Sequence, residues 1–428
     1  MSESTGKYGL PLNVVFCKKC TMSNQRPNST VEFKQTEKEK KKVLAFDEHG
    51  ICDACNYAEA KKKINWEERH EKLKDLCNRF RRNDGRYDVV VPGSGGKDSV
   101  QAAYKLKYDY NMNPILITWP PAIYTDIGKR NFNAWLDAGF ANYTYNQNKK
   151  LHRFLTKSAF LNLGHPFQPF ILGQKNLAPK LSVLLDIPLV IFGENEAEYG
   201  NPTIDNVKPT RDPKFYSAKL SLKDLVLGGL PAQDLIDKYK YKLSDLEAYL
   251  PVNPHEIDKT GTEVHYLGYY VKWHPQETYY YSVEKTNFMP NDHRTEGSYS
   301  KYSSIDDKID WLHYHTTSIK FGLGRATYDS AQEVRNGDLT RDEGISLIKR
   351  FDGEFPEQYI KDCCDYMGIS LQEYHDTTEK FRSPHLCLKI IIFEWGNKFL
   401  ANLACRLPIL PKPTINMLLI IKFIFILL

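Results

Sequence analysis

The chain has 428 residues, of which 41% are hydrophobic and 26% charged, and this composition predicts a globular protein with a substantial core. Its net charge of +5 arises from 58 basic and 53 acidic side chains, a mild excess that suits an anionic substrate and does not indicate a nucleic-acid binder. No basic start followed by an apolar run is present, and nine cysteines are too few for a disulfide scaffold. We therefore expect a cytoplasmic protein with reduced thiols and without membrane association.

Two cysteine pairs mark the first segment, residues 1–64. Cys17 and Cys20 form one CxxC turn, and Cys52 and Cys55 form another. Each turn aims two thiolates at one point, so two turns together predict a tetrahedral Cys₄ zinc site. Because the protein fills all four positions, the zinc would be structural and would staple a segment too small to build its own core. The long separation between the pairs leaves an iron–sulfur cluster as an alternative.

A helix and then an alternation of strands and helices follow, over residues 65–200. Asn65 is a good N-cap for a helix that reaches about residue 82. Short apolar runs at 87–91, 115–119, 140–145 and 189–192 predict strands, and helical stretches separate them. This pattern indicates an α/β fold with a doubly wound, mostly parallel sheet. The loops at the carboxyl ends of such strands meet along one edge, where ligands bind.

A glycine-rich turn follows the first of these strands and opens a helix. Its residues are Ser94, Gly95, Gly96, Lys97, Asp98 and Ser99. Glycines let backbone N–H groups approach an anion, and a helix N-terminus offers unpaired donors, so the turn predicts a phosphate-binding site. A carboxylate beside phosphates makes sense mainly as a ligand for Mg²⁺, which gives Asp98 that predicted role. The spacing differs from that of a Walker A loop.

Two further groups at the carboxyl ends of strands are candidates for the nucleotide site. Glu194, Asn195 and Glu198 follow the strand at 189–192, and we expect them to hold Mg²⁺ or nucleotide together with Asp98. The alternative is an acidic helix start favoured by the helix dipole. Thr118 and Trp119 end the second strand and are candidates for the adenosine pocket.

The rest of the chain divides into three ranges. Residues 201–303 predict a substrate-facing insertion or lid, with a strand from Tyr266 to Val271, and residues 304–385 predict a helical region. Residues 386–428 form an atypical apolar tail that is too short for a membrane span of about 20 residues and contains Lys422. An interfacial anchor, a buried terminal segment and out-of-frame translation are the alternatives for this tail, and we favour the last as a hypothesis.

The combined motifs resemble one family within the ATP-pyrophosphatases. The phosphate loop resembles that of the PP-loop superfamily, whose members cleave ATP between the α and β phosphates and share an adenine nucleotide alpha hydrolase-like fold. Together with the CxxC pairs, three later segments resemble bacterial N-acetyl sugar amidotransferases: Arg294 to Gly297, Lys320 to Ala326 and Tyr266 to Tyr270. The tail after Leu386 departs from that family.

The resemblance implies an ATP-dependent enzyme that converts an acetamido group of a nucleotide-linked N-acetyl sugar into an acetamidino group for surface glycans. ATP, Mg²⁺ and structural Zn²⁺ would be its cofactors, and Arg294, Lys320 and Arg325 are candidates for anionic groups of substrate or nucleotide. The sequence contains no recognisable glutaminase module, so we expect a separate glutaminase subunit to supply ammonia. A tRNA-modifying enzyme of the thiolation type is the alternative function.

Overall fold

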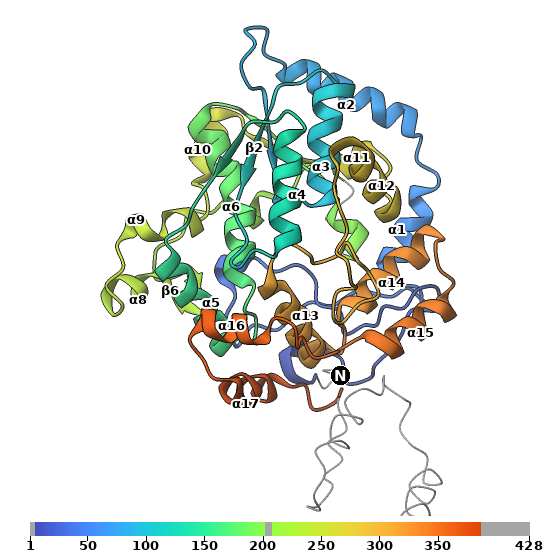
Figure 1. The fold of residues 1–428 in the computed structure, drawn as a ribbon, viewed down its shortest axis with the longest axis vertical. Helices are drawn as coiled ribbons and strands as arrows, with labels where there is room; N and C mark the ends of the chain where they lie inside the picture. Colours follow the sequence, from blue (N-terminus) through green and yellow to red (C-terminus); the bar gives the residue numbers. More distant parts are fainter. Residues whose placement is uncertain (1–4, 202–207, 387–428) are drawn as a thin grey trace, which may run out of the picture.

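Five parallel strands form the central sheet of the chain, whose computed structural model describes residues 5–201 and 208–386 (Figure 1). The strand order is β3-β2-β1-β4-β7. The strands are β1 (Val89–Pro92), β2 (Pro114–Thr118), β3 (Asn142–Thr144), β4 (Leu189–Phe192) and β7 (Glu263–Tyr266). Val90 pairs with Ile115 on one side and with Val190 on the other, so β1 lies in the middle. The predicted α/β class with a mostly parallel sheet is confirmed.

Helices cover both faces of this sheet because its central strands bury side chains in both directions. Val90 packs in one core with apolar residues of α5 (Lys149–Leu163) and α6 (Gln168–Leu185). Its neighbours Val89 and Val91 pack in a second core with α2 (Trp66–Phe80), α3 (Lys97–Tyr104) and α4 (Asp126–Asp137). Strands that are buried on both faces are continuous hydrophobic runs, which is why β1, β2 and β4 were visible in the sequence. Asn65 caps α2 as predicted, accepting from Glu67 N and Glu68 N.

The range 201–303 contributes the outer strand of the sheet as well as short helices. The strand predicted from Tyr266 to Val271 is wrong in position: β7 ends at Tyr266, and Leu267–Tyr270 is the short helix α11. Gly268 N donates to Gly193 O at 3.1 Å and turns the chain out of the strand. The uniformly apolar and aromatic stretch gave no periodicity that could locate this end. The other elements are β5 (Val226–Leu227), β6 (Leu230–Pro231), α8 (Ala232–Asp237), α9 (Leu243–Leu246), α10 (Pro254–Thr260) and α12 (Pro275–Thr286).

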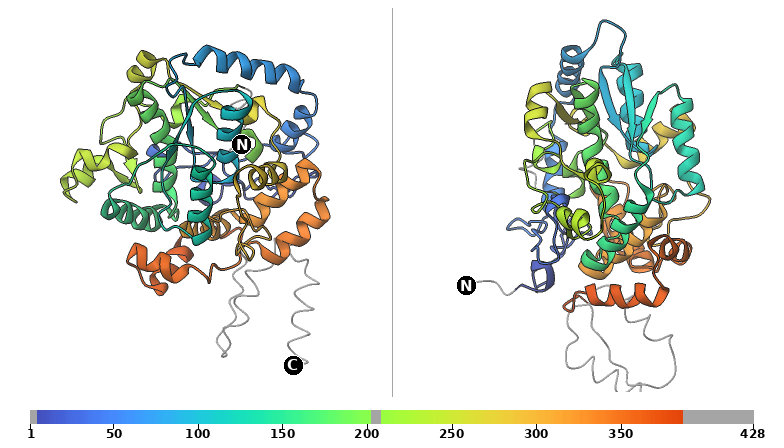
Figure 2. Two further views of the ribbon diagram at one scale, coloured as in Figure 1. Left: turned by 45° about the horizontal axis from the view of Figure 1, so that its top comes forward. Right: turned by 90° about the vertical axis from the view of Figure 1, so that its left-hand side faces the viewer.

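The last described region is helical, as predicted for residues 304–385. Its helices are α13 (Lys308–Phe321), α14 (Arg325–Asn336), α15 (Arg341–Phe351), α16 (Ile360–Met367) and α17 (Leu371–Phe381). They gather at the end of the molecule opposite α2, and α14 lies beside α1 (Asp53–Lys61) of the first segment (Figures 1 and 2). The tail beyond residue 386 is outside the described residues. Within 5–201 and 208–386, no helix has both the length and the apolar character needed to cross a bilayer.

Single-turn and π-helical elements complete the described chain. The π-helical turn η3 (Lys105–Asp109) continues α3. The single turns are η1 (Lys7–Gly9), η2 (Glu32–Lys34), η4 (Glu196–Tyr199), η5 (Pro213–Phe215) and η6 (Glu247–Tyr249). Of these, η4 bears directly on the site, because it follows β4 at the carboxyl edge of the sheet.

Candidate active site at the phosphate loop

The glycine-rich turn joins β1 to α3 in a conformation that leaves one side open. Gly95 has φ +92°, and a Cβ there would lie 2.7 Å from the backbone of Phe132, so the position requires glycine. A Cβ on Gly96 would meet nothing within 4 Å. Ser99 Oγ donates to Gly96 O at 2.9 Å and closes the turn from within. The open side at Gly96, at the start of α3, is therefore where an anion can reach the backbone N–H groups.

The variant Gly96→Ala distinguishes an effect on ATP binding from an effect on the stability of the fold. Gly96 is the N-cap of α3 in an extended conformation that alanine adopts readily, so we expect Gly96→Ala to change the free energy of unfolding by about 1 kcal/mol or less. The added methyl group stands where phosphate would approach, and we expect ATP affinity to fall about tenfold or more. Titration calorimetry and thermal melts measure the two effects. Gly95→Ala is the contrasting variant and should lose stability, whereas unchanged ATP affinity in Gly96→Ala would contradict the assignment.

Two carboxylates from neighbouring loops meet beside this turn. A Cβ on Gly193 would lie 2.5 Å from Asp98 O, so the loop after β4 packs directly on the start of α3. The Asp98 carboxylate accepts from Trp273 Nε1 at 2.7 Å and pairs with Lys97 Nζ at 2.6 Å. Burial, and then the charge of Asp98, raises the pKa of Glu194 to about 7. The structure thus brings the predicted Asp98 and Glu194 together.

The surroundings of Glu194 fit a divalent cation. Its carboxylate accepts from Tyr199 OH at 3.1 Å and, among the described residues, forms no ion pair within 4 Å. Asp98 and Glu194 are partly buried carboxylates that repel each other, and Lys97 offsets part of that repulsion. Carboxylate oxygens are preferred ligands of Mg²⁺, which would offset it further. Asp98 and Glu194 can therefore hold Mg²⁺ next to the phosphate loop. Sequence reasoning missed Tyr199 and Trp273, which have no motif of their own.

The other two polar residues after β4 have different surroundings from those expected. Asn195 is fully buried and caps η4, accepting from Ala197 N at 3.0 Å. Glu198 forms a buried ion pair with Lys61 Nζ at 2.8 Å, and the same ammonium donates to Trp273 O. The helical turn η4 starts at Glu196, so Glu194 lies outside it and does not share a helix face with Glu198. Glu198 links the loop to the first segment instead of presenting its carboxylate beside Glu194.

The helical C-terminal region supplies the opposite wall of the site. Asp306, just before α13, accepts from Ser94 Oγ at 2.6 Å and is missing from the predicted residues. Burial raises the pKa of Asp306, and the charge of Arg325 opposes that rise. The charge of Arg325 also opposes the rise in the pKa of Tyr199 that burial causes. The guanidinium pairs with Asp329 Oδ1 at 3.0 Å and donates to Tyr314 OH at 2.7 Å. The charge of Arg325 thus influences groups beside the phosphate loop, while its hydrogen bonds go to Asp329 and Tyr314.

The other two predicted substrate cations are engaged elsewhere. Arg294 forms two hydrogen bonds with Glu354, at 2.6 and 2.8 Å, and lies over the ring of Phe351. Lys320 is 4% exposed and donates to Leu163 O at 2.6 Å. Burial lowers the pKa of Lys320 to about 7. Neither cation contacts the phosphate loop: Arg294 is bound within the C-terminal region, and Lys320 links that region to the end of α5.

The two candidates for the adenosine pocket differ in their surroundings. Thr118 is fully buried and accepts from Asn142 Nδ2 at 2.8 Å within the sheet. Trp119 lies over Gly173 of α6 and lines a hollow with Ser94 and Phe170. This hollow has a volume of about 20 Å³, enough for one water molecule. Adenine would fit beside Trp119 only after side chains of α6 moved.

The four cysteines of the first segment converge as predicted. All are buried, and their sulfur atoms lie within 4.8 Å of one another. The Sγ–Sγ distances are 3.7 Å for Cys17–Cys55 and 3.6 Å for Cys20–Cys52. Zinc bonded to four thiolates at about 2.3 Å separates neighbouring sulfurs by about 3.8 Å. The four thiolates can therefore hold one structural zinc ion. An iron–sulfur cluster, the alternative, would need the thiolates to bind more than one iron atom and so to lie further apart.

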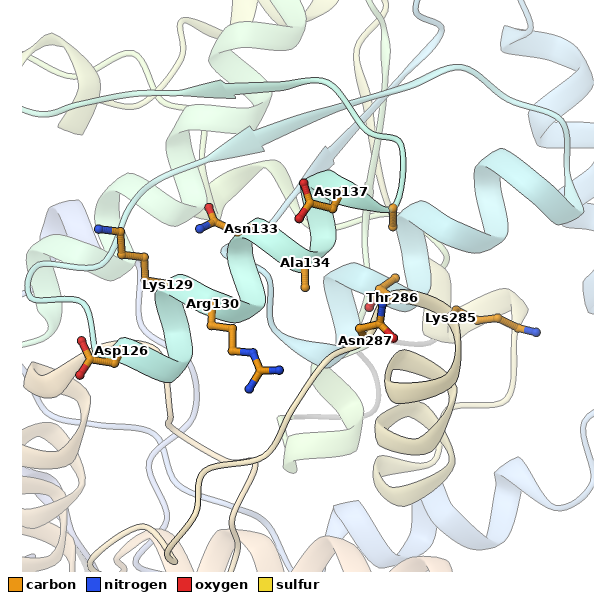
Figure 3. A pocket seen from close by; sticks show the side chains of 10 residues that line it. Asp126, Lys129, Arg130, Asn133, Ala134, Asp137, Lys285, Thr286 and Asn287 are labelled. Atoms are coloured by element: carbon orange, nitrogen blue, oxygen red, sulfur yellow. The ribbon is translucent and has the colours of Figure 1, made fainter.

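A larger surface cleft lies away from these groups. It has a volume of about 710 Å³ and runs between α4 and the end of α12 (Figure 3). Its side chains include Lys129 and Arg130 from α4 and Lys285 from α12. None of the predicted site residues lines it. The phosphate loop packs on α4 through Gly95, but no residue of the loop lines this cleft.

The structure thus combines an α/β fold, a glycine-rich turn at the start of α3, a partly buried acidic pair beside that turn and a Cys₄ cluster that can hold a metal ion. Residues 296–394 match the family described as LPS biosynthesis protein WbpG-like, C-terminal domain. The match includes α13 to α17 and extends past Leu386, where the change in composition was placed. Both Asp306 and Arg325 lie in the matched range.

A second similarity is to a curated protein of Methanocaldococcus jannaschii strain ATCC 43067, described as uncharacterized. The two are 29% identical over 77 residues, which are 18% of this chain. The match spans 27% of the length of that relative. It assigns no activity to the chain.

Proposed function

We propose that the protein is an ATP-dependent amidotransferase that acts on the acetamido group of a nucleotide-linked N-acetyl sugar. The observation that supports it best is the meeting of two features: a phosphate loop with a paired acidic site, and a lipopolysaccharide biosynthesis domain that supplies Asp306 to the same loop. The first feature suits cleavage of ATP, and the second suits a glycan precursor as substrate.

The reaction has two steps. An amide oxygen is a poor leaving group, so transfer of AMP from ATP onto that oxygen, with release of pyrophosphate, activates the carbon. Ammonia then attacks this carbon, and AMP leaves with the oxygen, which gives the acetamidino group. The backbone at Gly96 is suited to hold phosphate oxygens, whereas the Ser94 hydroxyl donates its one proton to Asp306 and would have to leave that acceptor to donate to a phosphate. Bound at Asp98 and Glu194, Mg²⁺ would neutralise charge on the phosphates.

Ammonia is expected from a separate glutaminase subunit. Glutamine hydrolysis by a cysteine nucleophile needs an accessible thiol of low pKa. All seven cysteines among the described residues are buried, and four of them form the metal cluster. Burial raises the pKa of Cys77 to about 12 and also raises that of Cys363 and Cys364. The same facts count against a thiolation enzyme that works through a cysteine near the phosphate loop.

Mass spectrometry of the sugar tests the proposed reaction. Nucleotide-linked N-acetyl sugars are incubated with the full chain, ATP, Mg²⁺ and ammonium, and the exchange of oxygen for NH should lower the sugar mass by about one dalton. Glutamine alone should give no product, because the ammonia source is a separate subunit. Bulk tRNA serves as the competing substrate. AMP formation that depends on tRNA and not on a sugar would contradict the proposal.

A further inference from the structure

We infer that a second cavity, between α5 and α16, binds the nucleotide-linked sugar, with the phosphates of the sugar nucleotide at Lys149 and Arg153; this inference rests on the proposed function. The cavity has a volume of about 470 Å³, which is within the range of small-molecule sites. We place the substrate in this cavity and not at Arg294 and Lys320, because Arg294 is paired with Glu354 and Lys320 is buried and bonded to Leu163 O.

The cavity lies at the edge of the sheet where ligands of α/β folds bind. One wall is residues 120–124, which follow β2, and another is Asn146 and Gln147, which follow β3. The third wall comes from α16, which lies beside α5 (Figure 1). Helix α16 belongs to the range that matches the lipopolysaccharide biosynthesis domain. The nucleotide-binding sheet and the glycan-related domain therefore build this cavity together.

A short connection joins the cavity to the phosphate loop. The carboxylate of Asp307 accepts from Ala122 N at 2.6 Å and from Ile123 N at 3.3 Å, and so fixes the wall that follows β2. The preceding residue, Asp306, accepts from Ser94 Oγ. Two consecutive aspartates thus hold the cavity wall and the phosphate loop side by side. A sugar in the cavity would lie next to ATP on the loop.

The charges that line the cavity favour an anion. Lys149 and Arg153 are one turn apart on α5, and the Arg153 guanidinium lies over the ring of Tyr366, 5.0 Å from its centroid. The described residues place no carboxylate within 4 Å of either cation. The acids of the opposite wall are neutralised, Asp362 by Lys308 at 2.5 Å and Asp365 by Lys361 at 2.8 Å. Two uncompensated cations at the start of a long helix are suited to a diphosphate.

Two polar side chains of the cavity have atoms without a partner among the described residues. Gln147 is 9% exposed, and its amide makes no hydrogen bond to any described residue. His152 is 1% exposed; its Nδ1 pairs with Tyr249 OH at 2.9 Å, and Nε2 has no partner in the described part of the chain. Burial lowers the pKa of His152 to about 4, so the ring is neutral at pH 7. Neither the Gln147 amide nor His152 Nε2 is sealed from solvent, so hydroxyl or amide groups of a sugar in the cavity would form hydrogen bonds with them.

Calorimetric binding to the full chain tests this cavity, with UDP-N-acetylglucosamine, UDP-N-acetylgalactosamine and Mg²⁺-ATP as probes. We expect Lys149→Gln and Arg153→Gln each to weaken sugar-nucleotide binding about tenfold or more, with ATP binding unchanged. Lys150→Gln, an exposed cation on the same helix that does not line the cavity, is the matched control and should bind as the wild type. Thermal melts of all three variants should match the wild type.

The outcomes test the assignment of the cavity and the proposed reaction separately. Wild-type affinity for the sugar nucleotides in both glutamine variants overturns the cavity assignment, and so does failure of the wild-type protein to bind either sugar nucleotide. Binding that depends on Lys149 and Arg153, without any AMP formation from ATP and ammonium, supports the cavity and contradicts the proposed reaction. Gly96→Ala should show the reverse pattern, with ATP binding weakened and sugar binding retained.

Discussion

Replacing Asp98 by Asn should reduce AMP formation about 100-fold or more, equivalent to about 2.7 kcal/mol of transition-state stabilisation. The change keeps the shape of the side chain and leaves an oxygen to accept from Trp273 Nε1, so the fold should persist. It removes the negative charge that, with Glu194, would hold Mg²⁺ beside the phosphate loop. Release of AMP from labelled ATP, measured over a range of Mg²⁺ concentrations, checks the loss.

The control for this variant is Asp137→Asn, an exposed aspartate at the end of α4 that lines the outer cleft. It should form AMP at the wild-type rate. Excess Mg²⁺ should restore part of the activity of Asp98→Asn, because Glu194 remains. A folded Asp98→Asn protein that forms AMP as fast as the wild type would contradict both the cation site and the proposed use of ATP.

Local sequence signals predicted the parts of the site that a short segment can specify. The phosphate turn needs a strand, glycines at Gly95 and Gly96 and a helix start, all within a few residues. The zinc ligands come in two CxxC turns for the same reason. Buried parallel strands are continuous apolar runs, so the sheet was visible as well. These features depend on residues that are neighbours in the chain.

The parts that were missed depend on contacts between distant segments. Asp306 reaches Ser94 across 212 residues, and Trp273 reaches Asp98 across 175. No periodicity or motif records such pairs. Arg294 and Lys320 were predicted to bind substrate because they lie in segments that resemble the amidotransferase family. In the structure both are already bonded to acceptors within the protein. A residue type predicts its chemistry, whereas its partner is decided by tertiary packing.

One of these distant contacts joins the metal segment to the acidic loop. Lys61, in the first segment, pairs with Glu198 inside the protein. Arg335 of α14 donates to Glu198 O at 2.7 Å, and its other nitrogen lies 3.9 Å from Cys20 Sγ. Arg341 of α15 donates to the carbonyls of Cys17 and Cys20 at 3.2 and 3.1 Å. The cysteine cluster therefore supports α14, which begins with Arg325 at the site.

Loss of the metal should thus damage the site as well as the first segment. We expect Cys52→Ser to lose zinc and to remove hydrogen-exchange protection from residues 5–64 and from α14 and α15, while β1 and β2 stay protected. Structural zinc contributes about 10 kcal/mol or more to the folding of small zinc domains, comparable with the whole stability of a typical domain. AMP formation should fall because Arg325 loses its support. Hydrogen exchange with mass spectrometry and metal analysis measure these effects.

Cys364→Ser is the control variant, because it removes a buried thiol without removing a ligand of the metal. Cys364 is 5% exposed and packs in the core of α13, α16 and α17, away from the cluster. Its replacement should cost about 1 kcal/mol of unfolding free energy and leave the zinc content and the protection of residues 5–64 unchanged. A metal-free Cys52→Ser protein that keeps full protection in the first segment and in α14 would show that packing alone orders them. The link from the metal to the acidic loop through Lys61 and Arg335 would then carry no stabilising role.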